Sequence, residues 1–191
     1  MGAGGYAGRI RAVWCLLLAL AGCASTPPLL TPTPQADAPF ALSGRVAVRQ
    51  GQQHDTAGLR WTHAARDEIL LQGPLGYTAA RIRRDAQGAT LEDAYGRRYQ
   101  AADAEALMQQ ALGWSVPLVG LPYWLQGRAA PQGEARAERN EAGQIVALYQ
   151  QGWEVRFLKY AGAQRDALPL HIELQRDGLQ VVLHIDQWQA P

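Results

Sequence analysis

The stretch LQVVLHIDQW, residues 179–188, alternates apolar and polar side chains along most of its length. Val181, Leu183 and Ile185 fall on one face of an extended chain, and His184 falls on the other. Successive side chains of a β-strand point to opposite faces. This alternation therefore predicts a strand with one face toward water and one face toward an apolar interior.

The same period of two recurs along the chain from residue 40 onward. The connections between the alternating runs are short and turn-rich, so consecutive strands are expected to pair antiparallel. We count about eleven strands, and an antiparallel sheet of that size must curl or close. The pattern resumes after residue 132, and the clearest predicted strands cover residues 41–48, 57–61, 68–72, 77–83, 89–93, 97–100, 144–150, 153–160, 168–174 and 179–188.

Two short amphipathic helices are predicted between the two runs of strands. In ADAEALMQQALG, residues 102–113, Asp103 suits the N-cap and Gly113 suits the position after the last turn. In SVPLVGLPYWLQG, residues 115–127, either proline suits the first turn and Gly127 ends the helix. Because both helices lie between strands in the sequence, we expect them to cross the mouth or the open side of the curled sheet.

The N-terminal segment is predicted to be a lipoprotein signal peptide. Arg9 and Arg11 precede an apolar run, residues 12–21, which is too short to cross a bilayer as a helix. The run ends in LAGC, where Cys23 stands as in a bacterial lipobox, whose cysteine is diacylated and becomes the first residue of the mature chain. Residues 1–22 are thus predicted to be the signal peptide and Cys23 the lipid attachment site. The alternative is an ordinary secretory signal with an unmodified cysteine.

Residues 23–39 are predicted to be the lipidated cysteine followed by a tether. This segment is rich in Pro, Thr and Ala, a composition typical of semi-rigid extended linkers. Neither Ala24 nor Ser25 is the aspartate that retains many lipoproteins in the inner membrane, so the outer membrane is expected. The only cysteine left in the mature chain would be Cys23, so the domain predicted over residues 40–191 must be stabilised by core burial.

The charged and catalytic residue types indicate no enzyme. The chain has 18 Lys and Arg against 17 Asp and Glu without a basic stripe, so nucleic acid is not an expected partner. The sequence contains no pair with metal-ligand spacing, no nucleophile elbow, no phosphate loop and no dinucleotide fingerprint. Acidic side chains are interpreted as solvated surface charges. We therefore predict no catalytic residue, no metal and no cofactor, although a periplasmic enzyme remains a weaker alternative.

Apolar and aromatic side chains are abundant, and five of the six tryptophans fall after residue 40. Each is interpreted first as a core residue. A curled sheet of about eleven strands can nevertheless enclose more volume than its side chains fill, as ligand-holding barrels do. An apolar cavity for an apolar ligand is therefore predicted. The inward-facing candidates for its lining are Trp61, Ile69, Leu71, Leu107, Leu112, Leu121, Trp124, Leu125, Val155, Leu174 and Leu183.

Several motifs follow one another in a characteristic order along the chain. A lipobox is followed by SGRVAV, a tryptophan closing the next strand, GPLGYTAA, GRRYQAADAEALMQQALGWSVPLVGLPYWLQG and a final DQW. This order resembles the LolB family of outer-membrane lipoproteins from about Ser43 to Trp188. The resemblance implies a mainly β fold: a half-open antiparallel barrel of about eleven strands, with two or three short helices as a lid over an apolar cavity.

The resemblance also implies a function. Members of this family accept acylated lipoproteins from a soluble, LolA-like periplasmic carrier and insert them into the outer membrane. The implied partners are this carrier, the acyl chains of client lipoproteins and the inner leaflet of the outer membrane, and we expect a monomer anchored by lipid on the periplasmic face. The family's longer N-terminal helix is not matched by the short, proline-rich residues 31–42, so two helices are expected and a third is left open. The alternative function is a lipid-anchored scaffold module without a ligand.

The turn QGPLGYT, residues 72–78, holds an apolar side chain where a tight turn normally carries a polar one. Pro74 fixes its own φ angle and Gly76 tolerates a positive φ angle, so the segment is a turn by its chemistry. We predict that Leu75 protrudes into solvent and contacts the membrane during insertion, with Pro74, Leu75 and Gly76 as the membrane-insertion loop. The alternative is a leucine folded back over its own hairpin.

Overall fold

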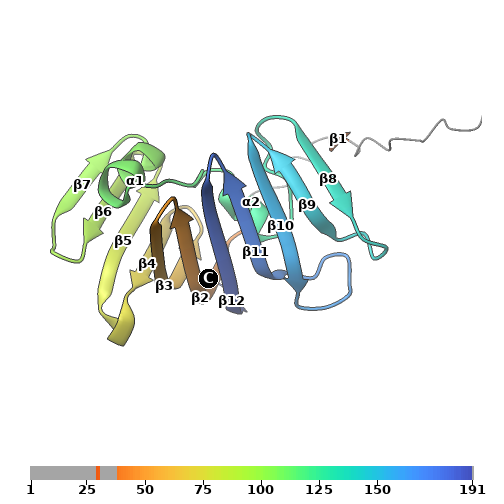
Figure 1. Ribbon diagram of the computed structural model, residues 1–191, viewed down its shortest axis with the longest axis horizontal. Helices are drawn as coiled ribbons and strands as arrows, with labels where there is room; N and C mark the ends of the chain where they lie inside the picture. The colour runs from red at the N-terminus through yellow and green to blue at the C-terminus, as the bar shows by residue number, and fades with distance from the viewer. Residues whose placement is uncertain (1–28, 31–37, 191) are drawn as a thin grey trace, which may run out of the picture.

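The computed structural model describes residues 29–30 and 38–190 of the chain (Figure 1). Cys23, the predicted signal peptide and most of the predicted tether lie outside this described part. The described residues form one antiparallel sheet and two short α-helices, which confirms the prediction of a mainly β fold. The strands are β1 (Leu29–Leu30), β2 (Phe40–Gln50), β3 (Gln53–His63), β4 (Asp67–Gln72), β5 (Thr78–Asp85), β6 (Gly88–Asp93), β7 (Arg98–Ala101), β8 (Ala135–Arg139), β9 (Ile145–Gln150), β10 (Trp153–Tyr160), β11 (Pro169–Arg176) and β12 (Leu179–Gln189).

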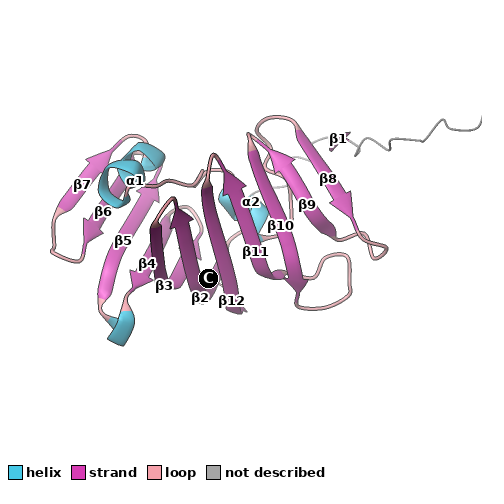
Figure 2. Cartoon of the chain, in the orientation of Figure 1, coloured by secondary structure: helices cyan, strands magenta, loops and turns pink. Residues whose placement is uncertain are grey.

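The strands are hydrogen-bonded in the order β1-β8-β9-β10-β11-β12-β2-β3-β4-β5-β6-β7. The strands β2 through β12 match the predicted number of about eleven strands. Strand β1 is an additional two-residue strand that pairs with β8. Within the described residues, β1 and β7 are the two edges and do not pair with each other. The sheet is therefore curved but open, as Figure 2 shows, and the expected half-open barrel is the observed form.

The first long strand and the last strand lie side by side in the middle of the sheet. β12 pairs with β2 along nearly its whole length, with a shift in register between Ile185 and Gln187. A Cβ atom on Gly44 would come 2.0 Å from the backbone oxygen of His184, so only glycine permits this close approach. The close pairing of β2 with β12 thus explains why the SGRVAV motif has a glycine at position 44.

The alternation in the strands is confirmed by burial. Val181, Leu183 and Ile185 of β12 are buried in the core, whereas His184 between them is exposed. The same alternation holds in the next three strands. Strand β3 buries Leu59 and Trp61, β4 buries Ile69 and Leu71, and β5 buries Ala80 and Ile82. Because every second residue of each strand faces one interior, a single hydrophobic core extends from β2 to β12.

Helix α1 (Ala104–Leu112) forms where the sequence predicts it. The Asp103 side chain accepts hydrogen bonds from the backbone N–H groups of Glu105 and Ala106, and Gly113 follows the last turn with a φ angle of 81°. These are the N-cap and the C-terminal glycine that the sequence indicates. The buried residues Leu107 and Met108 turn one face of the helix toward the sheet, near β6 and β7.

Helix α2 (Leu121–Leu125) is shorter than the stretch that predicts it. Pro122 stands in its first turn, while Pro117 remains in a separate turn whose carbonyl accepts hydrogen bonds from Gly120 and Leu121. Of the two prolines that suit a helix start, Pro122 alone lies in the first turn of an α-helix. Residues 114–117 belong to no helix or strand, so the chain between α1 and α2 lies over the sheet as an irregular strap rather than as a continuous helix.

Candidate functional site

An apolar cavity of about 40 Å³ lies between the sheet and the segment that carries α1 and α2. Strands β2, β3, β4, β5 and β12 form one wall. The other wall is formed by α1, α2 and the chain between them, residues 104–125, which we call the cover. Every lining side chain is aliphatic, aromatic or methionine. The cavity can therefore exclude water but offers no group that would orient a polar ligand.

The structure brings five of the eleven predicted lining residues together at this cavity, namely Trp61, Ile69, Leu71, Leu121 and Leu183. A sixth, Leu112, instead lines a separate cleft beside the cavity. The remaining five lie in the packed core and are at most 1 % exposed: Leu107, Trp124, Leu125, Val155 and Leu174.

The interior is packed rather than hollow beneath β9 and β10. The Trp124 indole N–H donates a hydrogen bond of 2.8 Å to Oε1 of Gln150, and the ring lies 6.2 Å from that of Trp153. The Gln150 amide also bonds to the backbone N–H and carbonyl of Ala130. These bonds attach the C-terminal end of the cover to β9, so the free volume lies on the side of β2 to β5.

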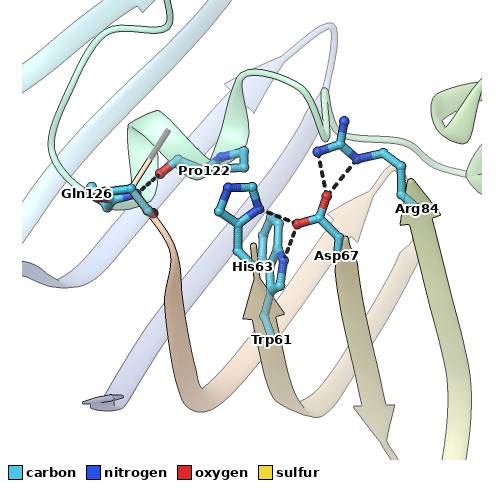
Figure 3. A network of polar contacts seen from close by, with 7 residues as sticks. Trp61, His63, Asp67, Arg84, Pro122 and Gln126 are labelled. Atoms are coloured by element: carbon cyan, nitrogen blue, oxygen red, sulfur yellow. Dashed lines mark hydrogen bonds and ion pairs between the residues drawn. The ribbon is translucent and has the colours of Figure 1, made fainter. Parts of the chain in front are cut away.

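A buried polar network holds the Trp61 ring in the cavity wall (Figure 3). The indole N–H of Trp61 donates a hydrogen bond of 2.9 Å to Oδ1 of Asp67. His63 Nδ1 lies 2.5 Å from the same oxygen, and Arg84 Nε donates to Oδ2 at 2.7 Å. Asp67 pairs with His63 across the β3–β4 hairpin and with Arg84 across β4 and β5, so the strand register itself assembles this network.

The electrostatics of Asp67 keep its carboxylate charged. Burial alone would raise the pKa of Asp67, but the hydrogen bonds from His63 and Trp61 and the positive charge of Arg84 outweigh it. The pKa therefore lies below its usual value, and the carboxylate is ionised at neutral pH. A buried carboxylate that is fully hydrogen-bonded in this way orients the aromatic ring that it holds.

The interpretation of all acidic residues as solvated surface charges is wrong at Asp67. Asp67 and His63 are only 2 % and 3 % exposed. The sequence does contain the signal, because His63 continues the inward-facing series of Leu59 and Trp61 in β3. Asp67 likewise begins the inward series of Ile69 and Leu71 in β4. Two polar residues in phase with buried ones predict a buried polar pair.

The eight cavity residues that the sequence prediction omits come from two sources. Those on strands follow the same alternation as the predicted ones and were detectable from it. On the cover, Met108 lies on the apolar face of α1 and was also detectable, whereas the other three depend on the path of the chain between the helices, which no periodic pattern encodes. The eight are Val46, Leu59, Ile82 and Val181 on strands and Met108, Trp114, Val116 and Leu118 on the cover.

The Pro74–Gly76 segment forms a single 3₁₀ turn, η1, at the end of the β4–β5 hairpin. Leu75 at its tip is fully exposed, which agrees with the predicted protrusion and not with a side chain folded over the hairpin. Gly73 lies beneath the Tyr77 ring, and a Cβ atom on it would come 2.2 Å from that ring. The tyrosine thus packs against the loop and leaves Leu75 outside it.

The backbone of Leu75 is strained. Its φ and ψ angles of 66° and 11° lie in the left-handed helical region. A residue with a Cβ atom is disfavoured there by roughly 1–2 kcal/mol. Among the described residues, the other non-glycine residues with a positive φ angle are Gln151 and Asp177, both polar. The fully exposed Leu75 side chain makes no buried contact that would offset this backbone strain. Backbone outliers of this kind concentrate at functional positions.

Comparisons with known proteins agree with one another over most of the chain. The family model described as "Outer membrane lipoprotein LolB" matches residues 38–188. An outer-membrane lipoprotein LolB of Chromobacterium violaceum is 41% identical over 187 residues, which cover 94% of this chain and 99% of the relative. The same protein of Nitrosomonas europaea is 36% identical over 190 residues, which cover 92% of this chain and 90% of the relative.

A solved structure shares the fold at low sequence identity. The crystal structure of a DUF1329 family protein from Desulfovibrio piger superposes with a TM-score of 0.53 and 8% identity, covering 80% of this chain and 85% of the other. At that identity the likeness concerns the fold alone. In the described part of the chain, neither helix has the length and apolar character needed to span a bilayer.

Proposed function

Because the chain belongs to the LolB family of outer-membrane lipoproteins, we propose that it accepts acylated lipoproteins from a periplasmic carrier and inserts them into the outer membrane. The observation that carries this proposal is the wholly apolar cavity beneath the cover. The proposed clients enter by their acyl chains, delivered by a LolA-like carrier. The proposed destination is the inner leaflet of the outer membrane.

The cavity must expand before it can hold an acyl chain. Its volume of about 40 Å³ is far below the ~300–1,000 Å³ that ligand pockets usually have. The strand wall is fixed by continuous hydrogen bonding, whereas the strap between α1 and α2 is not part of the sheet. Acyl binding therefore requires that the cover move away from β2 to β5 and that the described conformation be the closed one.

The energetics of acyl transfer suit such a site. Burying one CH₂ group is worth ~0.8 kcal/mol, so a long acyl chain free in water costs roughly 10 kcal/mol or more. A cavity that shelters the chain removes most of this cost. Transfer from the carrier to this protein and then to the bilayer can proceed without nucleotide hydrolysis, provided that each successive environment holds the chain more tightly than the last.

The test of the proposed function is direct binding of an acylated client. The probe is a synthetic diacylated lipopeptide with a dansyl label, added to the mature chain carrying Cys23→Ser so that no lipid of its own competes. Dansyl fluorescence and native mass spectrometry should both report a one-to-one complex. A protein that binds no lipopeptide under either method would exclude the acceptor function and favour the scaffold alternative.

Leu121→Asn is expected to weaken lipopeptide binding about tenfold or more while lowering stability only moderately. Leu121 lines the cavity on the cover, and in the proposed open state an amide at this position reaches water, so the cost is roughly 1–3 kcal/mol. The matched control is Leu174→Asn, in the packed core of β11, where the cost should exceed ~3 kcal/mol. Urea unfolding and lipopeptide titration measure the two effects, and parallel losses of binding and stability at both positions would contradict a cavity role for Leu121.

Cys23→Ala is expected to abolish acyl labelling of the chain. The prediction rests on the lipobox, since Cys23 lies outside the described residues. Cells grown with radiolabelled palmitate should yield a labelled wild-type protein and an unlabelled variant, with Cys15→Ala as the matched control that keeps the label. Two or three acyl chains are enough for stable anchoring. Retention of label in Cys23→Ala would reject this attachment site.

A further inference from the structure

A second space, lined by both apolar and polar surface, adjoins the cavity on the side of the Leu75 loop. It is an open cleft of about 340 Å³ between the β2–β3 hairpin, β5, the last turn of α1 and the loop itself. Its volume falls within the ~300–1,000 Å³ typical of ligand pockets. Pro74 and Tyr77 of the loop are part of its wall. Its polar lining groups are the side chains of Asp55 and Thr56, the Tyr77 hydroxyl and the Trp114 indole.

Three residues line both the cavity and the cleft: Val46, Leu71 and Trp114. Val46 belongs to β2, which pairs with β12 and β3, and Leu71 belongs to β4, which pairs with β3 and β5. Strand pairing on both sides holds these two in place. Trp114 belongs to no helix or strand. The boundary between the two spaces therefore has two fixed parts and one that can move.

The chain around Trp114 is held by its ends and not by its own hydrogen bonds. Among residues 29–30 and 38–190, no hydrogen bond involves Trp114, Ser115 or Val116. Immediately before them, the carbonyl of Gly113 accepts a bond of 2.9 Å from the Gln109 side chain. Immediately after them, the carbonyl of Pro117 accepts from two backbone N–H groups. Trp114 can thus swing aside without breaking a hydrogen bond, and it loses only apolar contacts.

We propose that Trp114 is a gate between the cavity and the cleft, and that an acyl chain leaves for the membrane through the cleft beside Leu75. This inference rests on the proposed function, because it assigns the exit route of the same ligand. A chain that moves from cavity to cleft passes from one apolar wall to the next, and the cleft ends at the loop whose tip is an exposed leucine. The acyl chain therefore keeps one side against apolar protein surface until it reaches the bilayer.

Two substitutions with opposite expected effects test this route. Trp114→Ala removes the gate and should speed transfer of the dansyl lipopeptide into vesicles of phosphatidylethanolamine and phosphatidylglycerol about fivefold or more. Ala111→Trp fills the cleft from the last turn of α1 and should slow the same transfer by a similar factor. The matched control is Ala106→Trp on the exposed face of the same helix, which should transfer at the wild-type rate.

Each variant is first checked by circular dichroism and by equilibrium lipopeptide binding. Trp114 also lines the cavity, so the equilibrium titration is used to load each variant to the same occupancy with lipopeptide. The proposal requires that the release rate of the bound lipopeptide then move in opposite directions in the two variants, since most such changes lie in the release rate. It is overturned if both variants transfer at the wild-type rate, or if both change transfer in the same direction. A wild-type chain that binds no lipopeptide would instead refute the proposed function, which is a separate and recognisable result.

Discussion

Leu75→Glu is expected to block delivery of lipoproteins to membranes while leaving the fold and acyl binding intact. Leu75 is fully exposed, so the substitution removes no packing contact. Burying a leucine side chain in hydrocarbon is worth ~2 kcal/mol, which corresponds to a roughly 30-fold change in an equilibrium. Glutamate loses this contribution and adds the cost of bringing a charge to the bilayer. The transfer rate into vesicles should therefore fall about 30-fold or more.

Two further variants separate the effect of the side chain from that of the backbone. Leu75→Gly and Leu75→Asn suit the left-handed φ angle better than leucine does, so each should raise the free energy of unfolding by up to ~1 kcal/mol. Both should nevertheless deliver poorly, because neither carries the apolar side chain. Urea unfolding and vesicle transfer measure the two quantities. Wild-type delivery by Leu75→Glu, or its failure to fold, would disprove the membrane-contact role.

Asp67→Ala is expected to lower the free energy of unfolding by about 3–5 kcal/mol, the range found when one partner of a buried ion pair is removed. The variant leaves the Trp61 indole N–H and the Arg84 guanidinium without their carboxylate partner. Stabilities of natural domains are only ~5–15 kcal/mol, so this is a large fraction of the total. The matched control is Asp186→Ala, which removes an exposed carboxylate 3.5 Å from Arg45 and should cost at most ~1 kcal/mol.

The same network predicts how stability depends on pH. The pKa of Asp67 is lower in the folded state than in the unfolded chain, so ionised Asp67 stabilises the fold above the unfolded pKa of about 3.8. This contribution is lost as the pH falls through the still lower folded pKa. Urea unfolding at pH 7, 4 and 3 should show a steeper acid decline for wild type than for Asp67→Ala. Identical pH profiles would show that the carboxylate contributes no pH-dependent stability.

The sequence predicts those parts of the fold that local chemistry determines. Alternation locates the long strands such as β12, and the Asp103 cap and Gly113 locate α1, because both signals come from neighbouring residues. The two-residue period is weak in β8, where the inward residues are Ala135 and Ala137 and the contrast with their neighbours is small. The sequence analysis therefore delimits no strand between residue 132 and residue 144, where β8 lies.

The candidate site is predicted less completely, for a physical reason. Alternation identifies which side chains face inward but not whether they meet a void or another side chain. Trp61 and Val155 face the same interior, yet only Trp61 lines the cavity. The difference depends on the cover, because Trp124 fills the space above β9 and β10, while the strap at Trp114 leaves space above β3 and β4. Such volume matching is a property of three-dimensional packing and not of residue order.

The seam between β2 and β12 also constrains how the protein is made. Among the described residues, the two halves of the sheet, β2 to β7 and β8 to β11, are joined in the ladder through β12, which is synthesised after all the strands that it joins. Pairing the two ends of a domain closes a long loop, and folds dominated by such distant contacts form slowly. Until β12 has paired with them, β2 and β11 each present an unpaired edge that can join other strands. The chain therefore depends on protection from aggregation until this eleven-residue strand has paired on both sides.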